Sequence, residues 1–224
     1  MHGAVKLLIG LGVVGGLLVA ADRVAVGVAE DQAADAAVSS GWLTEKPTVE
    51  IGDVPFLTSA VAGELDQVTL SSDGMTVTDG KERVTVHAFK ADLSQVKFTD
   101  SYRGVTVGRG DGQGVVEYKD LAKFMKGGGL LGLEYAGPGA VKASVPGGGI
   151  EGKLHSEGPD TIVVDGLQLT GTAASLKGLA GDLLKPQKFR LTGLPKGLSL
   201  AEATPEAGGV RLRFTVAPGT TLGH

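Results

Sequence analysis

The sequence predicts an α+β protein in which a long, curved antiparallel β-sheet wraps around a helix, preceded by an N-terminal membrane helix. An unbroken apolar run near the N-terminus predicts the membrane helix. A change to alternating apolar and polar residues after Pro47 predicts the sheet. The chain contains 37 glycines but only six Phe, three Tyr and one Trp. Because glycine permits strands to bend sharply and the other side chains are small, we expect the sheet to leave an apolar groove incompletely filled.

The N-terminal segment is predicted to direct the chain to the membrane. Leu7–Ala21 is apolar throughout, and as a helix it would extend about 22 Å. Extension of the Lys6 side chain toward the headgroups brings this segment near the spanning length. Residues 1–21 are therefore predicted to be a signal peptide or an uncleaved signal anchor, with the rest of the chain outside the cytoplasm. Small residues precede both Asp22 and Glu30, so cleavage before either residue is an open alternative.

The rest of the chain is divided by composition. A helix is predicted at residues 22–41, because Val24–Ser39 contains no proline and Gly41 is the usual kind of residue just past a helix end. Residues 42–217 are predicted to be a single α+β domain, because no Pro- or Ser-rich linker divides them, and residues 218–224 are predicted to be a tail.

Alternation of apolar and polar residues predicts strands in both halves of this domain. Asp73-Gly74 and Asp79-Gly80 are predicted to be hairpin turns. Gly108–Gly114 is predicted to be a flexible hairpin loop, because Gln113 replaces the third glycine of a phosphate-binding motif. The predicted strands include Leu65–Leu70, Met75–Val77, Val84–Ala88, Leu93–Phe98, Tyr102–Val107, Leu133–Ala136, Val141–Val145, Ile150–Leu154, Ile162–Val164, Phe189–Leu191, Leu198–Ala203 and Val210–Val216.

Short helices are predicted between these strands, at Phe56–Ala62, Val116–Lys126 and Ala173–Leu184. The second of them places Leu121, Phe124 and Met125 on one face.

Composition excludes several classes of function. The absence of Cys excludes disulfides, thiolate metal sites and a cysteine nucleophile, and a net charge of −4 gives no basic surface for nucleic acid. The four histidines are terminal or isolated, so no metal site is predicted and His87 is interpreted as a solvated residue. Ser94–Lys97 matches an S-x-x-K motif, but that chemistry needs a helix and this segment alternates as a strand. No catalytic residues are predicted, and the chain is not expected to be an enzyme.

Apolar residues are the remaining candidates for a site. The loop Gly127–Leu133 carries leucines without charged neighbours, which predicts either packing into the core or contact with lipid. Several large apolar residues are likewise predicted to be core residues or to line a groove for acyl chains. The candidate lipid-binding residues are Phe56, Leu57, Val61, Phe89, Phe98, Leu121, Phe124, Met125, Leu130 and Leu131.

Several segments resemble the LmeA family of phospholipid-binding proteins, which belong to the actinobacterial envelope. The resemblance covers nearly the whole chain, although residues 127–187 match in pattern only. The P-F-L-T motif, residues 55–58, is moderately specific for this family. The similar segments are Pro47–Thr58 with Gly63–Val68, Val116–Ala122 (a Y-x-D-L-A motif), and Leu191–Leu200 with Gly209–Phe214.

This resemblance implies a fold like that of tubular lipid-binding proteins and a capacity to bind phospholipid, associated in one member with maturation of envelope lipoglycans. It implies no catalytic residues. Pro55, Phe56 and Leu57 match the family motif residue by residue, and we interpret them as fixing a helix under the sheet.

The sequence therefore predicts an extracytoplasmic, membrane-tethered phospholipid-binding protein that buries acyl chains in an apolar groove and supports cell-envelope lipid or lipoglycan biogenesis. Membrane lipid is the expected partner, no protein partner is identified, and no metal or cofactor is expected apart from bound phospholipid. The alternative is a non-catalytic structural or assembly module of the envelope, with a packed core and a protein partner.

Overall fold

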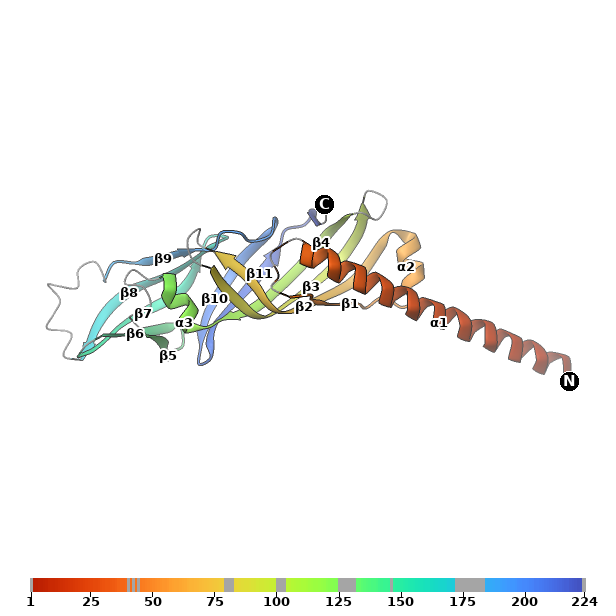
Figure 1. Cartoon of the computed structure of the whole chain (residues 1–224), viewed down its shortest axis with the longest axis horizontal. Coiled ribbons are helices and arrows are strands. Elements are labelled where there is room, and N and C mark those ends of the chain that lie inside the picture. Colours follow the sequence, from red (N-terminus) through yellow and green to blue (C-terminus); the bar gives the residue numbers. More distant parts are fainter. Residues whose placement is uncertain are drawn as a thin grey trace.

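Two antiparallel β-sheets make up most of the computed structural model (Figure 1). Sheet A has seven strands in the order β1-β2-β3-β4-β11-β10, with β12 paired to β4, and sheet B has five in the order β5-β6-β7-β8-β9. The structure describes residues 2–39, 41, 43, 45–78, 83–99, 104–124, 132–145, 147–171 and 184–222, but not the side chains of residues 2–15, 124, 145 and 222.

Most predicted strands lie within observed ones, but four of them merge into β2 and β3, β8 is longer than predicted, and β1 and β12 were not predicted. Sheet A contains β1 (Thr48–Ile51), β2 (Glu64–Thr78), β3 (Arg83–Thr99), β4 (Gly104–Val116), β10 (Leu198–Glu206), β11 (Gly209–Val216) and β12 (Thr220–Leu222). Sheet B contains β5 (Leu133–Gly137), β6 (Ala140–Val145), β7 (Gly148–Glu157), β8 (Thr161–Gly171) and β9 (Gln187–Arg190).

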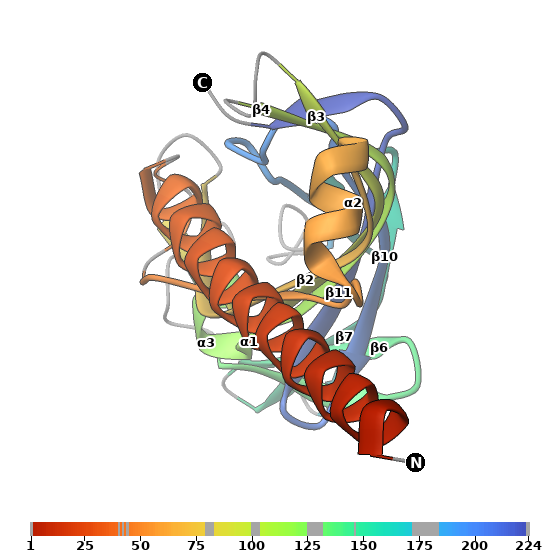
Figure 2. The same cartoon turned by 90° about the vertical axis from the view of Figure 1, so that its right-hand side faces the viewer.

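The α+β class is confirmed, with the long helix α1 (His2–Ser39) and the short helix α2 (Phe56–Ala62) at the end of the molecule opposite sheet B (Figure 1). The strands of sheet A curve around the side on which both helices lie (Figure 2). Most of the predicted membrane segment Leu7–Ala21 belongs to residues 2–15, whose side chains are outside the described part. Among the residues that are described, no helix is long and apolar enough to cross a membrane.

The predicted turn at Asp73-Gly74 is wrong, because β2 runs through these residues to Thr78. They lie opposite Ala88, where the backbone of β3 adopts a left-handed conformation (φ 49°). Buried positions in β3 change from Val84 and Val86 to Phe89 at this point, so the strand reverses which residues face inward. A second such residue, Gln95 (φ 54°), lies farther along β3. Asp73-Gly74 therefore lies opposite a kink in β3 and does not form a turn. The other predicted turn, Asp79-Gly80, lies outside the described residues.

The predicted loop at Gly108–Gly114 is also wrong, because this segment is the middle of β4. A Cβ atom on Gly110 would come within 2.7 Å of Leu93 and 2.8 Å of Val216, and one on Gly114 would come within 2.4 Å of Val86. The glycines therefore leave room for large side chains from neighbouring strands to lie over β4. At this strand glycine produces close packing and not the unfilled space that the composition suggests.

The remaining differences concern short elements. The predicted helix Val116–Lys126 is reduced to α3 (Tyr118–Leu121) and a 3-10 turn, η1 (Ala122–Phe124). The predicted helix Ala173–Leu184 lies, apart from Leu184, outside the described residues. Thr220–Leu222, within the segment predicted to be a tail, forms β12 and pairs with β4.

Among the described residues, buried apolar side chains form two clusters. Cluster one joins the sheets, since it contains Met75 and Phe214 from sheet A together with Ile162 from sheet B. Cluster two is small and is formed by Val26 of α1, Phe56 of α2, Leu65 of β2 and Val96 of β3. Leu93 of β3 packs against both clusters.

We predict that Gly114→Ala lowers the free energy of unfolding by about 1–3 kcal/mol, because the new methyl group overlaps the Val86 side chain. Gly208→Ala is the control, since nothing lies within 4 Å of the position of its Cβ atom. Urea denaturation followed by circular dichroism measures both variants. Equal stability of the two would contradict the packing role of the β4 glycines.

Candidate functional site

A row of half-buried apolar side chains separates the two clusters on the inner face of sheet A. Ile51 of β1 pairs with Val68 of β2, and Val68 pairs with Leu93 of β3, so these three side chains form one cross-strand row. Leu70 lies beside them and packs against cluster one, whereas Ile51 and Val68 pack against cluster two. We call Ile51, Val68, Leu70 and Leu93 the seam. It is apolar and incompletely buried, which are the properties that an acyl chain requires of its binding surface.

Helix α1 lies at the β1 edge of the seam and carries small side chains on its inner side. Ala25 and Ala29 pack against cluster two, and Ala37 packs against cluster one. Ala34, between them, is buried. Within sheet A the helix lies mainly against β1, the strand that carries Ile51, so α1 borders the seam on that side.

Asp22 attaches α1 to α2. The residue that precedes α2, Pro55, provides no side-chain cap for the helix. Instead the Leu57 amide donates a hydrogen bond of 2.8 Å to Oδ1 of the buried Asp22 carboxylate, which satisfies a free donor of the helix N-terminus. This hydrogen bond, together with one from Arg23, holds the pKa of Asp22 below its ordinary value.

Two further contacts hold α1 along the edge of sheet A. The Ile51 amide donates a hydrogen bond of 2.8 Å to Glu30, so a side chain of α1 pairs with a donor of the edge strand β1. Lys46, just before β1, forms ion pairs with Asp31 at 2.6 Å and Asp35 at 2.7 Å. Helix α1 is therefore held against the β1 edge of sheet A by polar contacts, and its inner side makes apolar contacts with the two clusters.

Asp53 fixes the connection between β1 and β2. Its carboxylate accepts hydrogen bonds from the amides of Asp66 (3.0 Å) and Gln67 (3.2 Å). Burial by itself raises the pKa of Asp53, but hydrogen bonds from Ser59 and these two amides outweigh it, so the pKa lies below its ordinary value. Because Ser59 belongs to α2, this buried carboxylate ties the helix to the start of β2.

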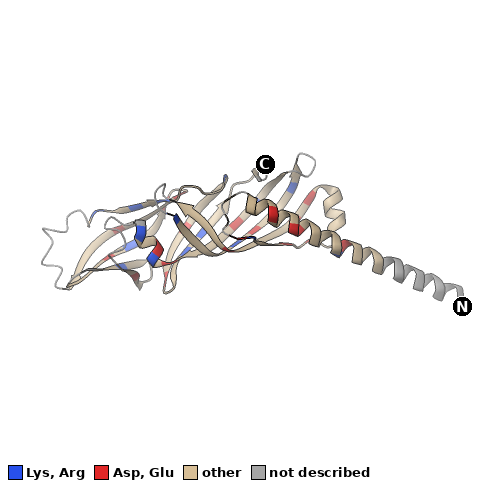
Figure 3. Cartoon of the chain, viewed as in Figure 1, with Lys and Arg blue, Asp and Glu red and all other residues tan. Residues whose placement is uncertain are grey.

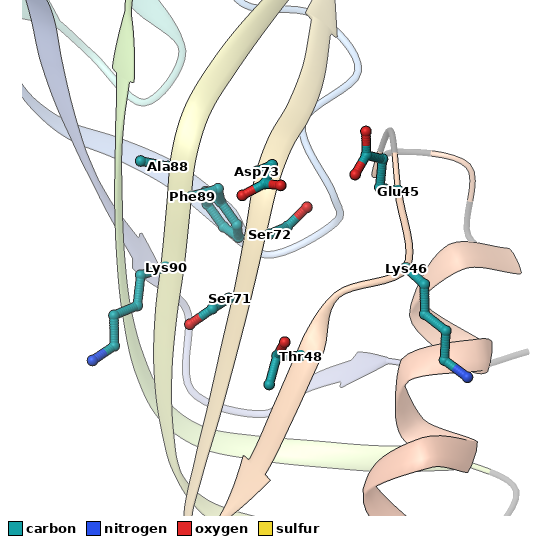
Figure 4. A pocket seen from close by; sticks show the side chains of 9 residues that line it. All are labelled: Glu45, Lys46, Thr48, Ser71, Ser72, Asp73, Ala88, Phe89 and Lys90. Atoms are coloured by element: carbon teal, nitrogen blue, oxygen red, sulfur yellow. The ribbon is translucent and has the colours of Figure 1, made fainter.

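A polar pocket of about 310 Å³ adjoins the seam (Figure 4). Ser72, two residues from Leu70 of the seam and on the same face of β2, belongs to its wall, and its cross-strand partner Phe89 supplies an apolar surface. The predicted groove is apolar, whereas this pocket carries two acidic and two basic residues. Its lining residues are Glu45, Lys46, Thr48, Ser71, Ser72, Asp73, Ala88, Phe89 and Lys90.

The predicted lipid-binding residues do not lie together. Phe56 and Phe98 belong to or pack against cluster two, whereas Phe89 and Leu121 are buried in cluster one. Phe89 lies edge-on to Phe214, with ring centroids 6.3 Å apart. The side chains of Leu57 and Val61 are exposed on α2. The Phe124 side chain and all of Met125, Leu130 and Leu131 lie outside the described residues.

The Y-x-D-L-A motif has a structural role. The Tyr118 hydroxyl donates a hydrogen bond of 2.7 Å to the Glu206 carbonyl at the end of β10, and burial raises the pKa of Tyr118 to about 12. Leu121 and Ala122 are buried in cluster one. His87 is half-exposed, with Nε2 3.9 Å from carboxylate oxygens of Glu117 and Asp120.

Sequence reasoning missed the contacts of Asp22, Glu30 and Asp53. Acidic residues in helices and turns are usually solvated, and nothing local to these three marks them as partners of backbone amides. Only α2 offered a clue in the sequence. Its N-cap residue is Pro55 and not Ser, Thr, Asp or Asn, so the free amides of its first turn need a hydrogen-bond acceptor from another part of the chain.

The comparisons with known proteins give one match. A model of the LmeA-like phospholipid-binding family matches residues 20–215. No curated protein and no solved structure matches the chain. The matched region begins within α1, two residues before Asp22, and includes the seam, the polar pocket and the Y-x-D-L-A motif.

We predict that Asp22→Ala accelerates hydrogen exchange of the Leu57 amide, because the amide loses its acceptor. Asp35→Ala is the control, since this carboxylate also lies on α1 but contacts Lys46. Exchange measured by mass spectrometry on peptides from α2 reports the effect. Unchanged exchange in the Asp22 variant would show that the cap does not hold α2.

We predict that Asp53→Ala lowers the free energy of unfolding at neutral pH by about 1–3 kcal/mol, because two amides lose their acceptor. The lowered pKa of Asp53 means that its contribution is present above the unfolded value of about 3.9 and is lost as the pH falls through the folded value. The stability difference from the unmodified chain should therefore shrink in acid. Asp66→Ala, which keeps the Asp66 amide, is the control, and a difference independent of pH would contradict the assignment.

Proposed function

This chain belongs to the LmeA-like phospholipid-binding family, and on that premise we propose that it is an extracytoplasmic, membrane-tethered protein that binds phospholipid without changing it chemically. The family match carries the proposal. The seam and the polar pocket provide two adjoining surfaces of different polarity, which is the pattern that an amphipathic ligand needs.

In this proposal the acyl chains bind along the seam beneath α1. Each methylene group transferred there from water contributes about 0.8 kcal/mol. Ile51, Val68 and Leu70 are only partly buried without lipid, so they have apolar surface left to cover. The alanine face of α1 supplies the opposite wall, and a small movement of this helix away from β1 would widen the space.

The headgroup binds in the polar pocket. Ser72 of the pocket is two residues from Leu70 in β2, so the two side chains share one face of the strand, and a lipid with its chains on the seam has its headgroup within reach of the pocket. The hydroxyl groups of Thr48 and Ser71 there can donate hydrogen bonds to a phosphate ester, and a polar lining does not suit an acyl chain.

The apolar N-terminal segment provides the membrane tether. Leu7–Ala21 leads directly into Asp22 within one continuous helix, α1. Cleavage before Glu30 would remove Asp22 and Val26, and with them the cap of α2 and one member of cluster two. The contacts therefore favour a chain that keeps every residue from Asp22 onward, and the proposed orientation places sheets A and B outside the cytoplasm.

The proposed cellular role is support of envelope lipid or lipoglycan biogenesis by lipid binding, with no catalytic step. The alternative, a structural or assembly module with a packed core and a protein partner, is favoured by one observation, the close packing around the β4 glycines. The two functions differ in whether lipid enters the fold.

We predict that Leu70→Gln reduces labelling of β1–β3 by a photoactivatable phosphatidylcholine at least about fivefold. Placing the glutamine side-chain amide against acyl chains without a hydrogen-bond partner should weaken lipid binding by about 1 kcal/mol or more. The measurement uses the full chain in vesicles and maps cross-links by mass spectrometry. Thr76→Gln, on the same strand but paired with Thr85, is the control. Cross-links confined to Leu7–Ala21 in the unmodified chain would contradict lipid binding in the seam and favour the structural alternative.

A further inference from the structure

Helix α2 presents an apolar surface to solvent. Val54, Leu57 and Val61 are 79%, 40% and 84% exposed, respectively. Leu57 and Val61 are four residues apart and so share one face of the helix, while Phe56 points into cluster two. We call Val54, Leu57 and Val61 the apical patch.

The segment that carries the apical patch has no charge of its own, and the nearby Arg23 is paired with Asp22. Residues 54–63 contain no charged side chain, and the neighbouring Asp53 carboxylate is buried by its hydrogen bonds to β2. The whole of α2 is free of charged residues in Figure 3, whereas charges are scattered over the strands. Exposed aliphatic side chains on and just before an uncharged helix are unfavourable in water and favourable at a membrane interface.

The apical patch lies where the apolar segment of α1 leaves the fold. Asp22 accepts the hydrogen bond from Leu57, so Ala21, the last residue of the apolar run, is adjacent to α2. Leu17, Leu18 and Val19, just before it, are 64–66% exposed. Beyond this point α1 extends away from the rest of the molecule on the side of α2 (Figures 1 and 2).

We propose that the apical patch inserts into the interfacial region of the phospholipid bilayer that holds the α1 segment. This inference rests on the proposed tether, and it adds a second membrane contact. One helix alone would let the sheets swing freely, whereas α1 and α2 together fix one end against the bilayer. Sheet B then lies farthest from the membrane, and the edge of the seam at Ile51 lies near its surface.

Fluorescence quenching tests this insertion in the full chain. The sequence contains no Cys, so Val61→Cys provides a single site for an environment-sensitive NBD label. The variant is reconstituted in phosphatidylcholine and phosphatidylglycerol vesicles with or without a doxyl-labelled lipid. Lys153→Cys, on an exposed position of β7 in sheet B, is the matched control. We expect the doxyl lipid to quench the label at residue 61 severalfold more than the label at residue 153.

A second variant separates insertion from mere proximity. With the label at Val54→Cys, the added change Val61→Asp should reduce quenching toward the level of the control, because a carboxylate opposes insertion. Both positions are exposed, so the fold should be retained, as circular dichroism verifies. Persistence of full quenching in this variant would overturn insertion of the apical patch.

The other outcomes also decide the question. If the chain floats with vesicles but the label at residue 61 is quenched no more than that at residue 153, the apical patch does not insert and the tether stands. A label at residue 61 that is shielded from water but insensitive to doxyl lipid would mean that protein covers the patch, which overturns the inference. Failure to float with vesicles would overturn both the tether and the second contact.

Discussion

The buried carboxylate of Asp22 connects the two parts of the molecule. It follows immediately after the apolar run of α1 and accepts the Leu57 amide at the start of α2. Helix α2 is short and its N-cap residue supplies no side-chain cap, and its position determines that of Phe56 in cluster two. This charge-assisted hydrogen bond fixes α2 to the point where the proposed tether ends. The direction of the apical patch relative to the tether depends on that junction.

The interior combines two kinds of packing. Around β4, glycines let Val86, Leu93 and Val216 approach the backbone closely, and this part of the fold is solid. Along β1 and β2, between the clusters, apolar residues stay half-buried beneath a helix held largely by polar contacts at its rim. A lipid-binding fold needs both, because the rigid part preserves the sheet while the covered part accommodates a ligand. The positions of the glycines in the fold therefore tell more about its packing than their total number does.

Local patterns in the sequence predicted much of the fold. The α2 helix was predicted with its observed bounds, and alternation located strands in both sheets, because each depends on neighbouring residues. Asp73-Gly74 and Gly108–Gly114 were misjudged because their conformations are decided by cross-strand partners, Ala88 in one case and Leu93 with Val216 in the other. The site was harder to predict. Apolarity could be recognised at Val68 and Leu70, but their partial burial depends on the separation of two clusters that are assembled from distant segments.

The cover of α1 over β1 also has a consequence for how the chain is made. Edge strands expose unpaired backbone groups and invite association with other chains. Because synthesis proceeds from the N-terminus, α1 is complete before β1 emerges, and Glu30 is available to meet the Ile51 amide as soon as that strand forms. As the sheet forms, it therefore adds strands from a side that α1 covers, and the unpaired edge is the one on which the next strand is placed.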